Sequence, residues 1–167
     1  MPNWCNTQYV IVGDEKELEE LKSVLDRMNE RDCPKVSNDF GHMWLGELVT
    51  ELGFDWNERR CRGIIMDYGL KDGILFMDQE TAWCEQEGVR ESIEERFPSL
   101  TVYFLEEELG CGIFRTNDAA GDIFADRYLL VSETDWEYFN SKESMDEYLS
   151  KNYGDGDEVY TYEVEVV

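Results

Sequence analysis

Carboxylates and aromatic rings are interleaved through the last fifth of the chain. The segment from Glu133 to Glu165 holds 11 acidic residues against two lysines, together with seven aromatic residues. Carboxylates steer a basic partner toward a surface, and aromatic side chains supply contact area, so this composition is suited to an interaction surface. The residues expected to contact a partner are Glu133, Asp135, Trp136, Glu137, Asp146, Glu147, Glu163 and Glu165.

The last acidic pair suggests a sharper form of this hypothesis. Glu163 and Glu165 are expected on one face of a strand, about 6.8 Å apart, because each strand residue rises about 3.4 Å. Successive phosphates of one DNA strand are about 3.4 Å apart along the axis, so two such steps equal the expected distance between the two glutamates. The spacing is compatible with a protein that mimics a nucleic-acid backbone and engages a basic host protein. Solubility alone is the plainer explanation of the acidity.

Two groups of aspartates define an enzymatic alternative. Asp118, Asp122 and Asp126 recur every four residues, and Asp155 and Asp157 flank a glycine. Carboxylate oxygens suit Ca²⁺ or Mg²⁺, as in a small carboxylate-based, metal-dependent enzyme. The first group crosses an expected turn and strand, which would not gather three side chains round one ion, and the second lacks the rest of an EF-hand loop. We therefore expect no catalytic residue, no metal site and no cofactor.

Other familiar chemistry is missing from the sequence. The five cysteines are spaced by 23 to 28 residues without a C-x-x-C pair, which favours reduced, buried thiols in a cytoplasmic protein. His42 is the only histidine, and no glycine-rich phosphate loop occurs. No apolar run reaches the roughly 18 residues of a membrane helix. The net charge of −24 argues against direct binding to nucleic acid or to an anionic membrane.

The elements that must position these residues begin with a strand and a long helix. Residues 7–12 are apolar on both strand faces, which predicts a strand that is covered on both sides or lies centrally in a sheet. Asp14 and Glu17 form a capping-box pattern ahead of a helix over 15–30, where apolar residues recur at helical spacing. A short helical insertion is expected over 43–53.

A hairpin and a second helix follow. Residues 64–70 and 74–79 flank Asp72-Gly73, a strong hairpin signal. A helix is expected over 85–97 and a strand over 100–105. This order predicts an α+β fold with the split β-α-β, or ferredoxin-like, arrangement, in which helices cover one face of an antiparallel sheet.

A C-terminal β-α-β extension is expected to complete the fold. Strands over 109–116 and 123–131 would lengthen the sheet or form a hairpin at its edge, and residues 1–131 would form the core. In residues 132–167, an acidic extension on the same domain, Ser144 and Glu147 predict a capped helix, followed by a strand over 160–166. The exposed edge of that strand leaves a structural or assembly role as a third hypothesis.

Several patches resemble the YubB-like family of uncharacterised phage- and plasmid-borne proteins. The patches are the opening Met1-Pro2-Asn3-Trp4-Cys5-Asn6, the strand end Gly13-Asp14, and the segments Thr81-Ala82-Trp83, Arg96-Phe97-Pro98-Ser99-Leu100, Thr101-Val102-Tyr103-Phe104, Glu106-Glu107-Glu108 and Gly110-Cys111-Gly112. The resemblance implies a ferredoxin-like domain and a mobile-element origin, and because the family has no established activity it carries over no functional site. The acidic composition, the isolated cysteines and the missing catalytic motifs lead us to expect a non-enzymatic, cytoplasmic, acidic binding protein whose partner is a basic host protein.

Overall fold

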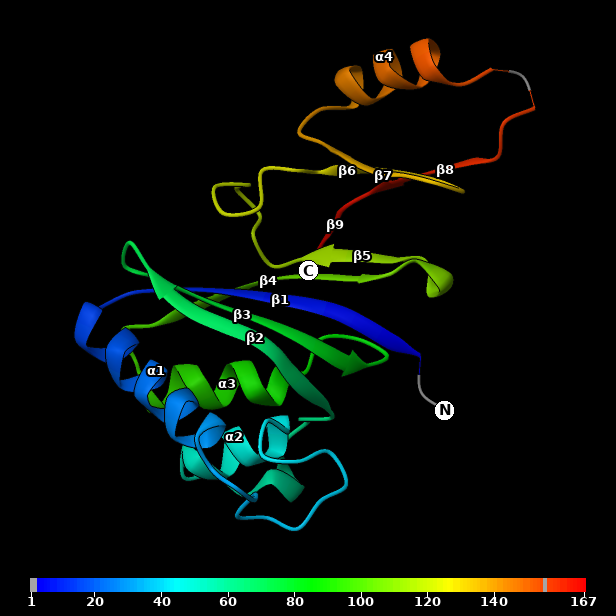
Figure 1. The fold of residues 1–167 in the computed structure, drawn as a ribbon. Coiled ribbons are helices and arrows are strands. Elements are labelled where there is room, and N and C mark those ends of the chain that lie inside the picture. Colours follow the sequence, from blue (N-terminus) through cyan, green and yellow to red (C-terminus); the bar gives the residue numbers. More distant parts are fainter. Residues whose placement is uncertain (1–2, 155) are drawn as a thin grey trace.

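The computed structural model describes residues 3–154 and 156–167 as an α+β protein with two β-sheets, which confirms the expected class. In chain order the elements are β1 (Trp4–Val12), α1 (Glu15–Asn29), α2 (Leu45–Glu51), η1 (Trp56–Glu58), β2 (Gly63–Lys71), β3 (Ile74–Ala82), α3 (Glu87–Arg96), β4 (Thr101–Glu108), η2 (Leu109–Cys111), β5 (Ile113–Thr116), β6 (Tyr128–Ser132), β7 (Trp136–Phe139), α4 (Lys142–Asn152), β8 (Val159–Glu163) and β9 (Glu165–Val166). The strand order is β2-β3-β1-β4-β5-β9 in the first sheet and β7-β6-β8 in the second (Figure 1). Met1 and Pro2 of the family resemblance, and Asp155 of the metal hypothesis, lie outside the described residues.

Strand β1 lies at the centre of the first sheet. It pairs antiparallel with β3 on one side and with β4 on the other, as expected for a central strand. Its burial alternates, because Cys5, Tyr9 and Ile11 are buried, whereas Val10 and Val12 remain partly exposed on the other face. The central position, one of the two predicted alternatives, is therefore confirmed, whereas the second face of the strand is not fully covered.

Helices α1, α2 and α3 all lie on one side of the first sheet (Figure 1). Asp14 caps α1 as predicted, because its carboxylate accepts hydrogen bonds from the backbone N–H groups of Lys16 and Glu17. Glu17 does not close a capping box, since its carboxylate accepts from the N–H and hydroxyl of Ser99 instead. The apolar face of α1 enters the core through Leu18, Leu21, Val24, Leu25 and Met28. No helix within the described ranges combines the length and apolar character needed to cross a membrane.

Gly88, near the start of α3, lies against the backbone of Arg60. A Cβ atom at this position would come within 2.4 Å of the Arg60 nitrogen and 2.7 Å of its carbonyl oxygen. Replacing glycine by alanine within a helix usually stabilises the helix by about 1 kcal/mol. Here the added methyl group would overpack against Arg60, so the substitution is expected to destabilise the protein. Gly88→Ala is expected to lower the free energy of unfolding by about 2 kcal/mol in urea titrations.

The control for this substitution is Glu91→Ala, an exposed change in the same helix that should stay within about 0.5 kcal/mol of the wild type. A Gly88→Ala variant as stable as the wild type would show that α3 can move away from Arg60 without cost.

The chain leaves the first sheet after β5. As expected, β5 lengthens the first sheet by pairing with β4. It begins only at Ile113, however, because Leu109–Cys111, predicted as part of this strand, form the 3-10 helix η2. The strand expected over 123–131 begins only at Tyr128, and this strand, β6, pairs with β7 and β8. Residues 117–127 form a loop between the two sheets rather than a hairpin turn. Local alternation predicted a strand here but assigned it to the wrong sheet.

Helix α4 covers one face of the second sheet. The rings of Phe139 in β7 and Tyr148 in α4 have centroids 5.3 Å apart. The helix cap is Ser141, whose hydroxyl accepts from the backbone N–H of Ser144 at 3.2 Å. The helix therefore begins before the predicted capping box at Ser144 and Glu147. Strand β7, four residues long, was not among the expected strands.

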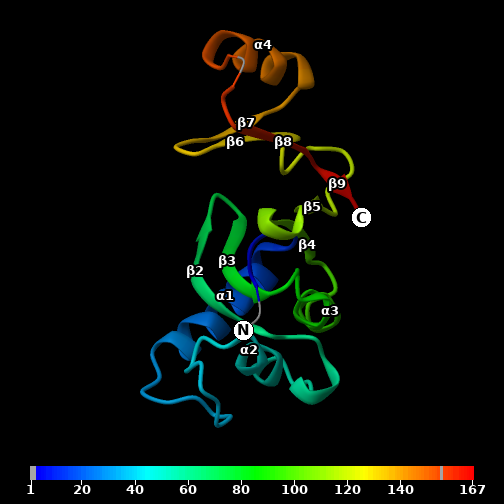
Figure 2. The same cartoon turned by 90° about the vertical axis from the view of Figure 1, so that its right-hand side faces the viewer.

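The last segment is divided between the two sheets, so the single strand expected over 160–166 is wrong. Strand β8 ends at Glu163 in the second sheet, and β9 begins at Glu165 in the first sheet, parallel to β5. Between them, the N–H of Val164 donates to the carbonyl of Arg127 at 2.9 Å. Figure 2 shows the chain running from β8 down to β9 beside β5.

Candidate functional site

The second sheet has two different faces. One face is covered by α4 and holds Leu130 and Phe139. The cross-strand register places a second set of side chains on the opposite face: Leu129, Val131, Trp136, Tyr138, Tyr160 and Tyr162. Trp136, Tyr138 and Tyr160 are 49%, 39% and 53% exposed. We call this second set the aromatic face.

The acidic residues predicted to bind a partner do not gather on one surface. Glu133 and Asp135 lie in the exposed turn between β6 and β7. Glu137 and Glu163 lie on the face of the second sheet that α4 covers. Glu165 lies in the first sheet. The expected arrangement of Glu163 and Glu165 on one face of a single strand is therefore wrong.

The two predicted acids of α4 are already paired. Lys142 lies 2.6 Å from the carboxylate of Asp146, and Lys151 lies 2.6 Å from that of Glu147. Exposed pairs at this helical spacing contribute only about 0.3–0.5 kcal/mol, so they matter little for stability. They do neutralise these carboxylates locally. Of the predicted contact residues, Trp136 alone belongs to the aromatic face.

A cleft of about 780 Å³ lies where the loop before β6 and the second sheet overhang the first sheet. Its floor is the face of the first sheet opposite α1, α2 and α3 (Figure 1). Its acidic lining consists of Asp78, Glu80, Glu107 and Asp126. Its apolar and aromatic lining includes Met66, Leu105, Ile123, Phe124 and Tyr138. In the described part of the chain, no lysine, arginine or histidine lines this inter-sheet cleft.

One hydrogen bond crosses the cleft. The hydroxyl of Tyr138 in β7 donates to Oε2 of Glu107 in β4 at 3.2 Å. The other carboxylate oxygen, Oε1 of Glu107, is buried without a hydrogen-bond partner among residues 3–154 and 156–167. Burial raises the pKa of Glu107, although the bond from Tyr138 opposes the shift. The cleft therefore contains a desolvated carboxylate with one unused acceptor.

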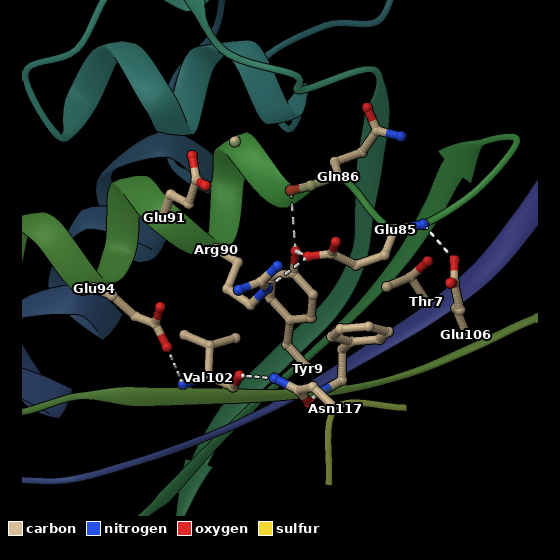
Figure 3. Close-up of polar contacts among 12 residues, drawn as sticks. Thr7, Tyr9, Glu85, Gln86, Arg90, Glu91, Glu94, Val102, Glu106 and Asn117 are labelled. Carbon is tan, nitrogen blue, oxygen red and sulfur yellow. Dashed lines mark hydrogen bonds and ion pairs between the residues drawn. The ribbon is translucent and has the colours of Figure 1, made fainter. Parts of the chain in front are cut away.

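A second polar group lies on the opposite, helix-covered side of the first sheet. Figure 3 shows Tyr9, Glu85 and Arg90 converging beneath the start of α3. The Tyr9 hydroxyl donates to Glu85 at 2.5 Å, and Nε of Arg90 donates to the same oxygen at 3.2 Å. Burial raises the pKa of Tyr9, and Glu85 raises it further. Burial also raises the pKa of Glu85, against the effect of Tyr9 and Arg90.

Glu106 connects this group to β4. It is only 1% exposed and accepts a hydrogen bond from the backbone N–H of Glu85 (Figure 3). The guanidinium of Arg115 lies 2.6 Å from its other oxygen. The thiol of Cys5 also donates to Glu106, at 3.8 Å, and burial followed by the charge of Glu106 raises the pKa of Cys5 to about 12.

A cavity of about 400 Å³ adjoins Glu85 and Glu106 and is also lined by Arg60, Arg90 and Arg115. A carboxyl with a raised pKa can exchange a proton near neutral pH. Here, however, Glu85 and Glu106 are each held by an arginine and by further donors, as in a structural ion-pair network. We therefore assign this cluster to the stability of the fold.

Two of the aspartates considered for a metal-dependent enzyme, Asp118 and Asp157, bind backbone N–H groups instead. The Asp118 carboxylate accepts from the backbone N–H groups of Gly121, Ile123 and Phe124. Asp157 accepts from the N–H of Gly154 at 2.7 Å. Within residues 3–154 and 156–167, no group of three or more histidine, cysteine, aspartate or glutamate side chains is placed to hold a metal ion.

The cysteines follow the expectation only in part. All five are free thiols, and Cys5 and Cys61 are buried. Cys33 and Cys111 are exposed and Cys84 is half-buried, so the expectation of buried thiols is wrong for these three. Burial raises the pKa of Cys61 to about 11.

Sequence reasoning missed the inter-sheet cleft. The run Glu106-Glu107-Glu108 contributed only to the family resemblance and to the acidic charge, although strand alternation from Val102 and Phe104 places Glu106 on the core face and Glu107 on the other.

Comparison with known proteins adds no assignment. No protein-family model matches the chain, and no curated protein or solved structure matches it either.

Proposed function

We propose that this chain is a non-enzymatic acidic protein that binds a basic region of a host protein. The observation that carries the proposal is the aromatic face, on which Trp136, Tyr138 and Tyr160 all remain exposed. Tryptophan and tyrosine are enriched among residues that dominate binding energy at protein interfaces. The net charge of −24 selects a basic partner and accelerates its association.

Charge, rather than spacing, supports mimicry of nucleic acid. The pair Glu163 and Glu165 does not support mimicry, because the two residues lie in different sheets rather than on one face of a strand. What remains is an excess of carboxylates that competes for the same basic surfaces as a phosphate backbone. The proposed partner is therefore a basic host protein, and direct contact with nucleic acid or an anionic membrane is disfavoured by repulsion.

We also propose a ferredoxin-like core within residues 1–131 and an acidic extension over 132–167 on the same domain. The order β2-β3-β1-β4 with α1 and α3 on one side supports the core, and β9 supports packing of the extension, since it adds the last strand to the first sheet. The resemblance to the YubB-like family supports a mobile-element origin, and the free thiols support a cytoplasmic location.

The proposal is tested by capture from host lysate at low and high salt. We expect the wild type to retain a basic protein at low salt and to release it at high salt, because salt screens exposed charges. Replacing Trp136 and Tyr160 together by serine should reduce retention about tenfold, since each is an exposed aromatic contact.

The matched control is Phe40→Ser, which removes an aromatic residue of similar exposure (47%) outside the second sheet. It should leave retention unchanged. Retention that is insensitive to salt, or that falls equally in both variants, would contradict the proposal.

A further inference from the structure

We propose that the inter-sheet cleft binds an arginine- or lysine-bearing extended segment of the partner protein, with Glu107 as the anchor of the basic side chain. This inference rests on the proposed function and adds its contact site and the chemistry of the bound segment. The cleft is lined by residues of β1, β2, β3 and β4, of the loop before β6, and of β7.

The charge of the cleft selects a cation. Asp78, Glu80, Glu107 and Asp126 reach it from three segments of the chain, and no basic side chain of the described residues lines it. Asp78 accepts one hydrogen bond, from the amide of Gln8 at 3.1 Å. Carboxylates gathered in a partly enclosed cleft focus their field, so they raise the local concentration of cations.

Glu107 is the proposed anchor because it lines the cleft and its carboxylate lacks a second donor among the described residues. Oε2 accepts from the hydroxyl of Tyr138, and Oε1 is buried, so a bound cation reaches Oε1 only by displacing the atoms that cover it. Guanidinium and ammonium groups are strong donors to carboxylates, and guanidinium offers two parallel N–H groups. The ring of Tyr138 also lines the cleft, where it can take a cation on its face.

The remaining walls favour a peptide over a small polyamine. Met66, Leu105 and Phe124 present apolar surface to the cleft, and such surface packs against the aliphatic stem of arginine or lysine and against apolar neighbours in a peptide. A volume of about 780 Å³ accepts more than one side chain. The aromatic face continues from Tyr138 to Trp136 and Tyr160 across the second sheet, so a longer segment finds further contacts there.

The test measures binding of a labelled hexapeptide of alternating arginine and leucine by fluorescence anisotropy. A peptide with citrulline in place of arginine, which keeps the shape without the charge, and spermine as an unlabelled competitor complete the probes. We expect the arginine peptide to bind the wild type, and Glu107→Gln to weaken its Kd about tenfold. The control Glu19→Gln removes the same charge from an exposed position of α1, on the other side of the first sheet, and should change Kd less than twofold.

Glu107→Gln is expected to fold. Burial raises the pKa of Glu107 above its unfolded value, so ionisation disfavours the folded state as pH rises through the folded pKa. Removing that charge should give a Tm at pH 7 no lower than that of the wild type. A loss of peptide binding therefore reports a lost contact rather than unfolding.

Three results overturn the inference. They are equal binding of the arginine and citrulline peptides, equal weakening by Glu107→Gln and Glu19→Gln, and displacement of the arginine peptide by spermine at an equal concentration. Failure of the proposed function is distinguishable. Salt-sensitive capture of a partner that Glu107→Gln does not weaken refutes the cleft assignment alone. Peptide binding that Glu107→Gln abolishes, without a captured partner, supports the cleft and refutes the proposed host-protein function.

Discussion

Glu106→Ala is expected to lower the free energy of unfolding by about 3 kcal/mol, because it leaves the partners of a buried carboxylate without an acceptor. Glu106 is 1% exposed and receives the guanidinium of Arg115 at 2.6 Å and the backbone N–H of Glu85. The side chain of Arg115 is 29% exposed, so water can solvate part of its charge after the substitution. This places the expected loss at the lower end of the range for breaking buried ion pairs.

Urea unfolding followed by circular dichroism measures this effect. Glu106→Gln keeps one acceptor oxygen and should lose less than the alanine variant. Glu133→Ala removes an exposed carboxylate and should remain within about 0.5 kcal/mol of the wild type. A loss below about 1 kcal/mol for Glu106→Ala would contradict a stabilising role for the buried cluster of Glu85, Arg90 and Glu106 (Figure 3).

The sequence predicted β1 to β4 and the α-helices between them because their signals are local. The apolar spacing of α1 and the capping carboxylate of Asp14 lie within one segment, and the Asp72-Gly73 turn defines its own hairpin. Asp72 and Gly73 have φ of 52° and 76°, the left-handed conformation that such a two-residue turn requires. Each of these signals is independent of the rest of the chain.

The second sheet was not predictable in the same way. Alternation in a strand indicates that one face is buried, but it does not indicate which sheet the strand joins. The segment Glu163-Val164-Glu165 alternates without interruption, yet the chain passes from one sheet to the other at Val164. At the crossing, the N–H of Val164 donates to the carbonyl of Arg127, a residue distant in the sequence. A pattern within the segment itself cannot predict such a hydrogen bond.

The inter-sheet cleft likewise combines features that local sequence predicts with features that only the tertiary structure shows. Alternation places Glu106 and Glu107 on opposite faces of β4, and this part follows from the sequence. The partner of Glu107 is Tyr138, in a strand that the sequence did not predict. The cleft exists because the loop over 117–127 holds the second sheet above the first, so its prediction required the tertiary structure.

Asp118→Ala is expected to lower the free energy of unfolding by about 3 kcal/mol, since three backbone donors lose a charged acceptor. The Asp118 carboxylate is 2% exposed and accepts from Gly121 at 3.1 Å and from Ile123 and Phe124 at 2.9 Å each. A hydrogen bond to a charged group contributes about 1.5–3 kcal/mol, and partial access of water to the loop offsets part of the sum.

The pH dependence of this loss has a defined sign. Burial alone would raise the pKa of Asp118, but the hydrogen bonds from Phe124, Ile123 and Gly121 outweigh it and lower the pKa below its usual value. A carboxylate with a lowered folded pKa stabilises the protein above its unfolded pKa of about 3.9 and loses this effect as pH falls through the folded pKa. The difference between wild type and Asp118→Ala should therefore be full at pH 7 and should shrink below about pH 4.

Thermal melts with EDTA, Ca²⁺ or Mg²⁺ separate this account from the metal hypothesis. A metal held by Asp118 would make the wild-type Tm depend on these additions, because a ligand of the folded state raises the midpoint. With the carboxylate occupied by three N–H donors, we expect the same Tm in all three solutions. The loop also carries Phe124 and Asp126 into the inter-sheet cleft, so Asp118→Ala should weaken binding of the arginine peptide under conditions where the protein remains folded. Unchanged peptide binding in a destabilised Asp118→Ala variant would show that the cleft keeps its shape without the bonds that order this loop.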